Sequence, residues 1–281
     1  MAEPVVATRQ TIEEIFDGAA NLYGRAGPNF FSYFGEKLVE LVAPADGARV
    51  LDVGTGTGAV LLPAAKCVGP SGQVVGIDVS SNMVRKAEEA VRQAGLTNCQ
   101  VLKMDAEHLE FEDWSFDAAL GGFSLLFISS MEAALQEMRR VLRPGGCVGV
   151  SLWSKAPPPF DPAWKIFADQ VRKYKVEVRM PQRVAYAPGE VPAILAGAGF
   201  DQIEIRTETI ELVYPTEEDW WRFQLTMGSR AALYRLSEEQ REQFKDEYLA
   251  QLRPLSRSDG LHLPAPALFA LARNSASKAH S

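Results

Sequence analysis

Short apolar runs that end in glycine or aspartate recur through the first half of the chain, with amphipathic stretches between them. The four runs are Val50–Gly54, Gln73–Asp78, Cys99–Asp105 and Phe116–Gly122. Apolar runs of this length that alternate with helical patterns predict βαβ units and a parallel sheet. Because ligands bind at the carboxyl ends of strands in such a sheet, we expect these glycines and aspartates to line one crevice.

The second half of the chain continues as strands and then becomes mainly helical. Strand patterns appear at Cys147–Trp153, Phe200–Val213 and Leu263–Ala272. Between the last two, Thr216 and Ser237 each stand three residues before an Asp or Gln, which is typical of a helix-capping pair. This pattern predicts a helical insertion before the last strand.

The turn after the first strand is suited to bringing backbone close to a ligand. Gly54, Gly56 and Gly58 permit positive φ, and the helix expected to start near Gly58 presents free N–H groups. Asp78 follows Gly58 by about twenty residues, a separation at which a carboxylate can hold ribose hydroxyls. A tight connection also explains a lone glycine turn, and a helix N-cap explains a lone aspartate. Their combination favours a site for a nucleotide-type cofactor.

Four motifs in this region carry a resemblance to a known family. They are Leu51–Gly58, Val75–Met83, Asp105–Glu107 followed by Phe116–Asp117, and Leu142–Gly146. With these motifs the chain resembles the class I S-adenosylmethionine-dependent methyltransferases, and within them the small-molecule branch that includes the ubiquinone and menaquinone C-methyltransferases. The resemblance covers residues 16–153 and fades afterwards.

The resemblance implies a doubly wound α/β fold. Its mostly parallel, seven-stranded, Rossmann-like sheet would have an antiparallel last strand and would carry a helical cap. The expected divisions are an N-terminal helical lid (1–45), a cofactor-binding core (46–213), a helical cap insertion (214–260), the last core strand (261–273) and a disordered tail (274–281).

The cofactor that the resemblance implies is S-adenosylmethionine, and each part of it is expected to meet its own motif. The glycine turn would contact the methionine part, Asp78 the ribose, Val79 and Met83 the adenine face, and Asp105 the adenine amino group. The turn after the fourth strand would lie beside the methyl group, and the lid would bring Tyr23 near the sulfonium or carboxylate. The expected cofactor-binding residues are Tyr23, Gly54, Thr55, Gly56, Gly58, Asp78, Val79, Met83, Asp105, Ala106, Gly121 and Phe123.

An NAD-binding Rossmann domain shares the strand, the glycine turn and the later carboxylate. Gly58, however, comes one residue early for the dinucleotide fingerprint. Asp52 places a carboxylate within the first strand, and Asp105 adds an acid after the third. These three features favour a methyltransferase over an NAD-binding domain.

The composition of the chain limits which kinds of molecule it is expected to bind. The 281 residues carry a net charge of −7 and contain no basic run, so neither nucleic acid nor an anionic membrane is an expected partner. No apolar run has transmembrane length and no signal-like region begins the sequence, which predicts a cytoplasmic protein. We expect a monomer or homodimer. Cys67, Cys99 and Cys147 are unclustered, so we expect buried thiols and neither a disulfide framework nor a zinc site.

The methyl acceptor is expected to be a small apolar or aromatic metabolite. The Gly121–Ser124 turn stands where amino-directed nucleic-acid methyltransferases carry Asn/Asp-Pro-Pro-Tyr, which disfavours base methylation. Candidate substrate contacts are Phe30, Phe127 and Trp221, although aromatic stripes of this kind also suit core packing. Transfer to oxygen, nitrogen or carbon stays open at this stage.

Methyl transfer from a sulfonium is a displacement that needs positioning and exclusion of water more than a dedicated base. His262 is the candidate catalytic base if one is needed, and the alternative is that it is a surface histidine or a locally bonded one. No metal site is expected. The alternative function is that of a natural-product cyclase, which would bind the cofactor on this fold without transferring methyl.

Overall fold

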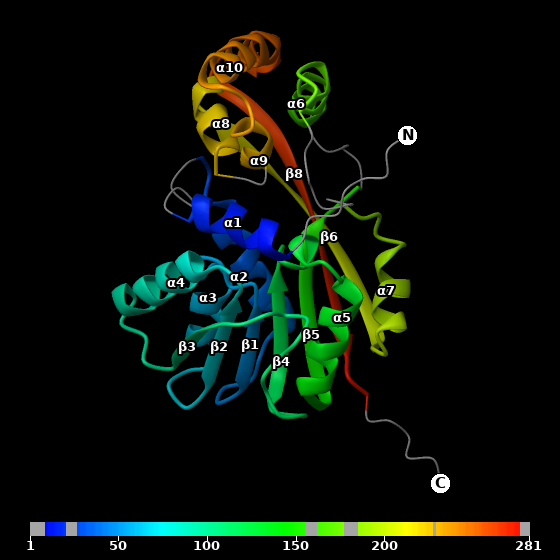
Figure 1. Ribbon diagram of the computed structural model, residues 1–281. Coiled ribbons are helices and arrows are strands. Elements are labelled where there is room, and N and C mark those ends of the chain that lie inside the picture. The colour runs from blue at the N-terminus through cyan, green and yellow to red at the C-terminus, as the bar shows by residue number, and fades with distance from the viewer. Residues whose placement is uncertain (1–8, 21–26, 156–161, 177–184, 227–228, 276–281) are drawn as a thin grey trace.

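The computed structural model describes residues 9–20, 27–155, 162–176, 185–226 and 229–275, and a mixed sheet forms their centre (Figure 1). The strand order is β3-β2-β1-β4-β5-β8-β6, so successive crossovers wind outward in both directions from β1. Strands β1 to β5 pair in parallel, and β8 pairs antiparallel with both β5 and β6. The doubly wound sheet and its antiparallel last strand are therefore confirmed. The strands are β1 Arg49–Val53, β2 Gln73–Asp78, β3 Cys99–Lys103, β4 Phe116–Gly122, β5 Leu142–Trp153, β6 Asp201–Tyr214, β7 Ser256–Arg257, which pairs only with β8, and β8 Gly260–Arg273.

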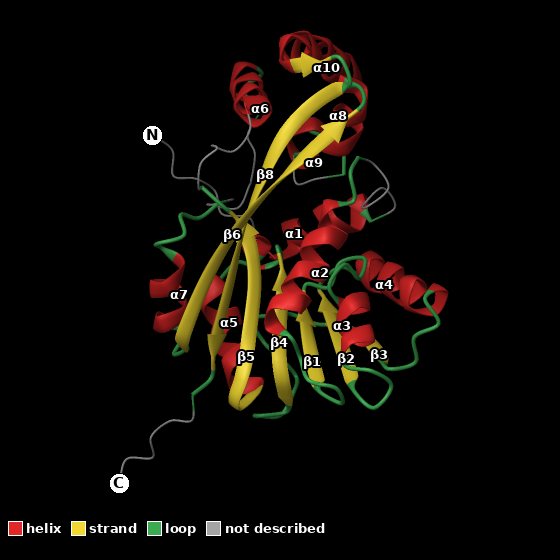
Figure 2. Cartoon of the chain, turned by 180° about the vertical axis from the view of Figure 1, so that it is seen from behind, coloured by secondary structure: helices red, strands yellow, loops and turns green. Residues whose placement is uncertain are grey.

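Helices cover both faces of the sheet. In Figure 1, α5 and α7 lie on the near face, and Figure 2 shows α2 and α3 on the opposite face. The α-helices are α1 Arg9–Ala19, α2 Phe30–Val42, α3 Leu61–Cys67, α4 Ser81–Gln93, α5 Met131–Val141, α6 Pro162–Lys173, α7 Val191–Gly197, α8 Glu217–Gln224, α9 Arg230–Leu233 and α10 Glu238–Leu252, and the 3₁₀ helices are η1 Leu125–Phe127 and η2 Arg253–Leu255. None of the described helices is long and apolar enough to cross a membrane.

Strand β1 is buried on both faces, as expected for the middle of a parallel sheet. Val50, Leu51 and Val53 have no exposed surface. Helix α2 packs close to the turn that follows this strand, because a Cβ atom on Gly35 would lie only 2.2 Å from the carbonyl oxygen of Ala59. Helix α2 is thus part of the core that fixes the glycine turn, and of the two helices described in the expected lid (1–45) only α1 lies over the edge of the sheet (Figure 1).

Helix α1 is held at its carboxyl-terminal end by both the core and the cap. Asp17 Oδ1 accepts hydrogen bonds from Ser80 Oγ and, at 3.0 Å, from the N–H of Asn82. It therefore satisfies a free donor at the start of α4. From the cap, the Arg230 guanidinium donates to the carbonyl oxygen of Gly18. Helix α1 consequently bridges the two parts of the molecule.

The cap stands beyond the carboxyl ends of the parallel strands and consists of α6, α8, α9 and α10 (Figures 1 and 2). Strands β6 and β8 extend into it as a long ribbon, in which Tyr214 still pairs with Leu261. Inside the cap, Trp220 Nε1 donates to Tyr248 Oη at 2.7 Å, and Tyr248 Oη donates to the Ala163 carbonyl at 3.1 Å. The bond from Tyr248 to Ala163 joins α6 to the rest of the cap. The sequence pattern did not predict helix α6.

Two local expectations are wrong. Asn274 is not the start of a disordered tail: it is buried, and its Nδ2 donates to the Leu142 carbonyl at 2.7 Å. The amide side chain thereby satisfies a carbonyl at the end of α5. Of the three cysteines only Cys147 is buried, since Cys67 ends the short α3 and is exposed, and Cys99 lies half-buried on the edge strand β3.

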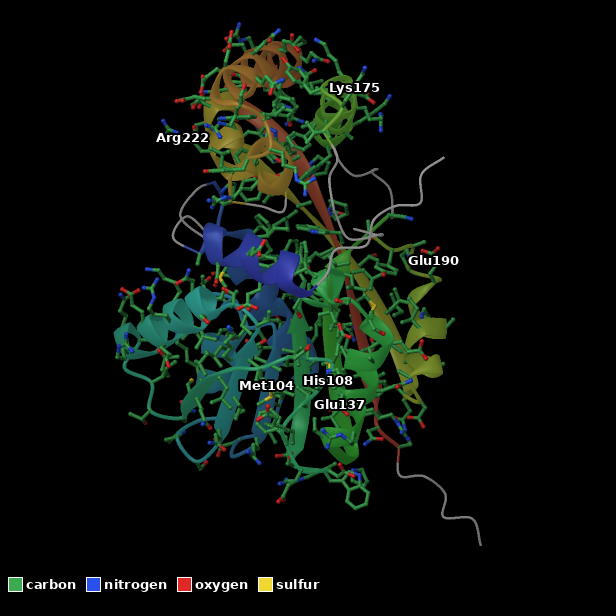
Figure 3. The ribbon with its side chains drawn as sticks, in the orientation of Figure 1. Met104, His108, Glu137, Lys175, Glu190 and Arg222 are labelled. Carbon is green, nitrogen blue, oxygen red and sulfur yellow. The ribbon has the colours of Figure 1, made fainter. Side chains whose placement is uncertain are left out.

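Residues 104–115 connect β3 to β4 across the near face of the sheet without forming a helix. Figure 3 shows Met104 and His108 on this segment, with Glu137 of α5 beside His108. Arg140 of α5 donates to the carbonyl oxygens of Leu109 and Phe111, both at 2.8 Å. Hydrogen bonds with Glu137 and Asp113 raise the pKa of Arg140, so the guanidinium stays charged while it clamps the segment.

We predict that Arg140→Met lowers the free energy of unfolding by about 2 kcal/mol, because carbonyl groups of the crossing segment lose a charged donor. Arg206→Met is the control, since Arg206 pairs only with the nearby, exposed Glu204 among the contacts described. Denaturant unfolding measures both variants. Equal stability of the two would show that Arg140 does not clamp the segment.

Candidate cofactor site

A cavity lies at the carboxyl ends of β1, β2, β3 and β4, and α1 covers it. Its walls combine glycines, apolar side chains and a single carboxylate. The described residues that line it are Ile12, Phe16, Gly54, Gly56, Ile77, Asp78, Val79, Met83, Met104, Ala106, Gly122, Phe123, Ser124, Phe127 and Ile128. The strand endings that the sequence predicted to converge thus meet at one crevice.

Asp78 is fixed at the end of β2 by backbone donors on either side. Gly56 N–H donates to Oδ2 and Ser80 N–H to Oδ1, both at 2.9 Å. The first bond ties the glycine turn to the carboxylate, and it requires the positive φ of 55° that Gly56 adopts. Burial raises the pKa of Asp78 to about 6, although the bond from Ser80 lowers it. The carboxylate therefore titrates close to neutral pH.

A second carboxylate, Asp52, is buried within β1. Thr55 Oγ1 donates to its Oδ2 at 2.6 Å, whereas Oδ1 has no hydrogen-bond partner among the described residues. Burial raises the pKa of Asp52 to about 7; the bond from Thr55 lowers it and the charge of Asp78 raises it. The two acids thus repel each other beneath the glycine turn.

The charge and polarity of the cavity fit the cofactor that the resemblance implies. Among the described lining residues none is a Lys or Arg, so the nearby carboxylates face no protein cation across the cavity. A sulfonium or ammonium group would supply the missing positive charge. Asp78 suits a ribose diol, and Met83 and Met104 suit an apolar purine face.

The turn after β4 carries local backbone strain at the cavity wall. Phe123 adopts φ of 54°, which is uncommon for a bulky residue. Its N–H donates to Ser151 at the carbonyl oxygen (3.0 Å) and at Oγ (3.2 Å), and these bonds hold the turn. Strained residues of this kind concentrate at functional sites.

The structure brings together most of the residues expected to bind the cofactor and places others elsewhere. Gly54, Gly56, Asp78, Val79, Met83, Ala106 and Phe123 line the cavity. The other described members lie behind or beside it: Thr55 holds Asp52, Gly58 faces a groove on the far side of the turn, Asp105 bonds the N–H of Glu107 in its own loop, and Gly121 is buried in β4. Tyr23 lies outside the described residues. Each binding role stays a prediction.

A second, smaller cavity lies between the core and the cap. Its walls are aromatic and aliphatic, and they come from α2, α6, α8 and the three strands β5, β6 and β8. The described residues that line it are Phe30, Trp153, Trp164, Leu212, Tyr214, Trp220, Phe223, Leu263, Pro264 and Ala265. We call it the cap cavity.

The three candidate substrate contacts occupy different places. Phe30 lines the cap cavity, and Phe127 lines the cofactor cavity with its ring 5.1 Å from that of Phe16. Trp221 lines neither cavity and instead packs against Phe244 and Tyr248 of α10. Its neighbour Trp220 lines the cap cavity, and the sequence could not choose between them because it does not fix the rotation of α8. A substrate contact for Trp221 stays a prediction.

His262 does not line the cap cavity, although Leu263, Pro264 and Ala265, which follow it in β8, do. His262 pairs with Glu211 at 2.9 Å and with Asp259 at 2.8 Å, and hydrogen bonds with these two carboxylates raise its pKa. The structure therefore gives His262 local partners, and its role as a base stays a prediction.

Several lining residues were not predicted from the sequence. Ile12 and Phe16 form the apolar face of the first helix, but the pattern does not reveal the surface under that face. Met104 directly follows β3, Ser124 lies in the turn after β4, and Ile128 follows η1. For Met104 and Ser124 the position just after a strand was the available signal, and for Ile128 the pattern offered none.

We predict that Asp52→Asn makes stability less dependent on pH. Since the pKa of Asp52 is raised from 3.8 to about 7, the folded state binds the proton more tightly, and stability is lost as the pH rises through this window. The variant should therefore exceed the wild type at pH 8 by roughly 1–4 kcal/mol and differ little at pH 4. Denaturant unfolding at both pH values tests this, with the exposed Asp246→Asn as control. A difference that is the same at both pH values would contradict the prediction.

Comparison with known proteins agrees with this geometry. A family model described as a methyltransferase domain matches residues 50–146. Nocamycin O-methyltransferase of Saccharothrix syringae is 34% identical over 218 residues, which are 73% of this chain and 77% of that protein. Demethylmenaquinone methyltransferase of Staphylococcus carnosus is 30% identical over 221 residues, 72% of this chain and 90% of that protein.

A solved structure extends the likeness to the whole chain. The [4+2]-cyclase SpnF superposes with a TM-score of 0.60 over 97% of this chain and 98% of that chain, at 22% identity. This likeness shows the fold alone. Because the match to the nocamycin enzyme covers more than two thirds of both chains, the chain belongs to the S-adenosylmethionine-dependent methyltransferases, and S-adenosylmethionine is its cofactor.

Proposed function

We propose that this methyltransferase acts on a small apolar or aromatic metabolite that binds beneath the cap. The observation that carries the proposal is a continuous aromatic wall between the two cavities. Phe123 lines the cofactor cavity, and its ring lies 4.4 Å from that of Trp153. Trp153 and Phe30, whose rings are 5.5 Å apart, line the cap cavity. An acceptor in the cap cavity would therefore lie on the other side of this aromatic wall from the cofactor cavity.

The walls of the cap cavity support an apolar acceptor. No described residue that lines it carries a charge, and six of them are aromatic: Phe30, Trp153, Trp164, Tyr214, Trp220 and Phe223. Aromatic side chains stack on flat rings and remove them from water. A charged acceptor would lose its hydration there without gaining a partner.

Bound S-adenosylmethionine supplies an activated methyl group. The chain's own contribution is to position the acceptor and exclude water: α1 covers the cofactor cavity, and the cap covers the acceptor. Among the described residues that line the cap cavity there is no His, Asp, Glu or Lys. This composition supports catalysis by proximity and desolvation, with at most a weak base.

The relatives support the class of acceptor without identifying it. One is named for the natural product nocamycin and another for demethylmenaquinone. The alternative function is a cyclisation that uses the fold but not the methyl group, and the likeness to a [4+2]-cyclase motivates it. An apolar cavity without a base suits either reaction.

Release of S-adenosylhomocysteine separates the two functions. The purified protein is incubated with S-adenosylmethionine and a panel of phenols, quinones and polyketides, and both acceptor and cofactor products are quantified. Equal amounts of methylated product and S-adenosylhomocysteine establish the transferase. Conversion of an acceptor without S-adenosylhomocysteine would establish the cyclase instead.

We predict that S-adenosylhomocysteine binds about tenfold more weakly at pH 5 than at pH 8. The ionised carboxylate of Asp78 accepts hydrogen bonds from ribose hydroxyls, and its pKa is raised to about 6, so affinity should increase as the pH rises through that value. Asp78→Asn should weaken binding by about 2 kcal/mol at pH 8 and remove the pH dependence. Calorimetry at each pH measures the affinity of both proteins for S-adenosylhomocysteine. A wild-type affinity that is constant from pH 5 to 8 would exclude this role for Asp78.

Once an acceptor is known, we predict that Trp164→Leu lowers kcat/KM at least about tenfold, since a buried aromatic contact is worth roughly 1.5 kcal/mol or more. S-adenosylhomocysteine affinity should not change, because Trp164 lies in the cap and not in the cofactor cavity. Trp114→Leu is the matched control, as Trp114 is 60% exposed on the segment between β3 and β4. If both variants keep full activity, the acceptor does not bind in the cap cavity.

A further inference from the structure

Ser124 presents a hydroxyl that the folded chain does not use. Of the described residues lining the cofactor cavity, only Asp78 and Ser124 have a polar side-chain oxygen. Both oxygens of Asp78 accept hydrogen bonds. Ser124 Oγ is buried from solvent, yet it has no partner anywhere in the described part of the chain. A buried polar atom without a partner costs roughly 1–3 kcal/mol and marks a place where a ligand group belongs.

Capping does not account for this serine. Ser124 precedes η1, where a serine normally accepts a hydrogen bond from the start of the helix. Ser80 and Ser130 do so at the starts of α4 and α5, at 3.1 and 3.2 Å. Ser124 instead has helical φ and ψ of −80° and −39°, and its side chain makes no capping bond. The hydroxyl is thus left for another partner.

The backbone holds Ser124 at a fixed place between the ends of β1 and β4. A Cβ atom on Gly54 would lie 2.4 Å from the Ser124 Cβ, so the serine packs directly on the first glycine of the turn. The strained Phe123 precedes it and is anchored by Ser151. The Ser124 hydroxyl therefore stays close to Gly54 unless the turn after β4 changes its conformation.

The layout of the cavity indicates which end of the cofactor meets Ser124. If Asp78 holds the ribose, the base extends toward Met83 and Met104, near the ends of β2 and β3. The other end then lies at the ends of β1 and β4, against Gly54 and Ser124. In S-adenosylmethionine that end is the amino acid, which carries a positive ammonium group.

We propose that Ser124 Oγ accepts a hydrogen bond from the α-ammonium group of bound S-adenosylmethionine and so positions the amino-acid end of the cofactor. The inference rests on the proposed contact between Asp78 and the ribose. The negative environment favours the ammonium over the carboxylate, because Asp52 is buried in the strand that precedes the glycine turn and no cation lines the cavity among the described residues. Ser124 is therefore a positioning residue in the turn after β4.

Ser124→Ala tests the proposal, because alanine keeps the Cβ contact with Gly54 and removes only the hydroxyl. Binding is measured by calorimetry with S-adenosylhomocysteine and with 5′-methylthioadenosine, which has the same nucleoside but no amino acid. The variant should bind S-adenosylhomocysteine roughly ten- to a hundredfold more weakly and methylthioadenosine as well as the wild type does. Ser129→Ala, an exposed serine that follows η1, is the control and should change neither affinity.

A deaminated analogue of S-adenosylhomocysteine identifies the interacting group. If the ammonium is the partner, wild type and Ser124→Ala should bind this analogue equally, as in a double-mutant cycle. A persistent difference would overturn the assignment to the ammonium. Equal loss of both original ligands would mean that Ser124 only shapes the cavity, and no loss would mean that it makes no bond; either result overturns the proposal. Failure of the wild type to bind any of these ligands would instead refute cofactor binding itself.

Discussion

The burial of two carboxylates under one glycine turn is the constraint on which the site depends. Asp52 and Asp78 stand on neighbouring strands, and burial raises the pKa of both. The chain stabilises them with polar hydrogens: Thr55 bonds Asp52, and the N–H groups of Gly56 and Ser80 bond Asp78. No described residue lining the cavity adds a positive charge. A sulfonium or ammonium group bound in the cavity would supply the missing positive charge.

The glycine turn can hold its N–H groups against the buried carboxylates because neighbouring elements fix it from several sides. Helix α2 packs on it through Gly35, and Ser124 packs on Gly54. Asp17 of α1 bonds to Ser80 and Asn82, beside Asp78, and its charge adds to the rise that burial causes in the pKa of Asp78. Covering the cavity and raising the pKa of Asp78 are therefore consequences of one packing arrangement.

The cap is proposed to cover the acceptor in the same way that α1 covers the cofactor cavity. Strands β6 and β8 continue past the sheet, and α6, α8 and α10 pack around them, with Tyr248 joining α6 to α8 by hydrogen bonds. Aromatic rings run from Phe123 in the cofactor cavity through Trp153 to Phe30 in the cap cavity. Since Arg230 of the cap also bonds to Gly18 of α1, the proposed acceptor site and the cover of the cofactor site are mechanically connected.

The sequence by itself determined the sheet and much of the cofactor cavity. Apolar runs fix strands locally, and parallel strands must bring their carboxyl ends to one edge, so the pattern alone placed Gly54, Gly56 and Asp78 together, and the family resemblance added Phe123. Contacts between distant segments could not be read in this way. Only the tertiary structure decided that Trp220 and not Trp221 faces the cap cavity, that His262 does not line this cavity, and that α6 joins the cap. Each depends on the rotation or docking of a whole element, which many packed side chains determine together and no local pattern encodes. The unused hydroxyl of Ser124 also could not be predicted from the sequence, because a missing hydrogen-bond partner becomes visible only when every neighbour is in place.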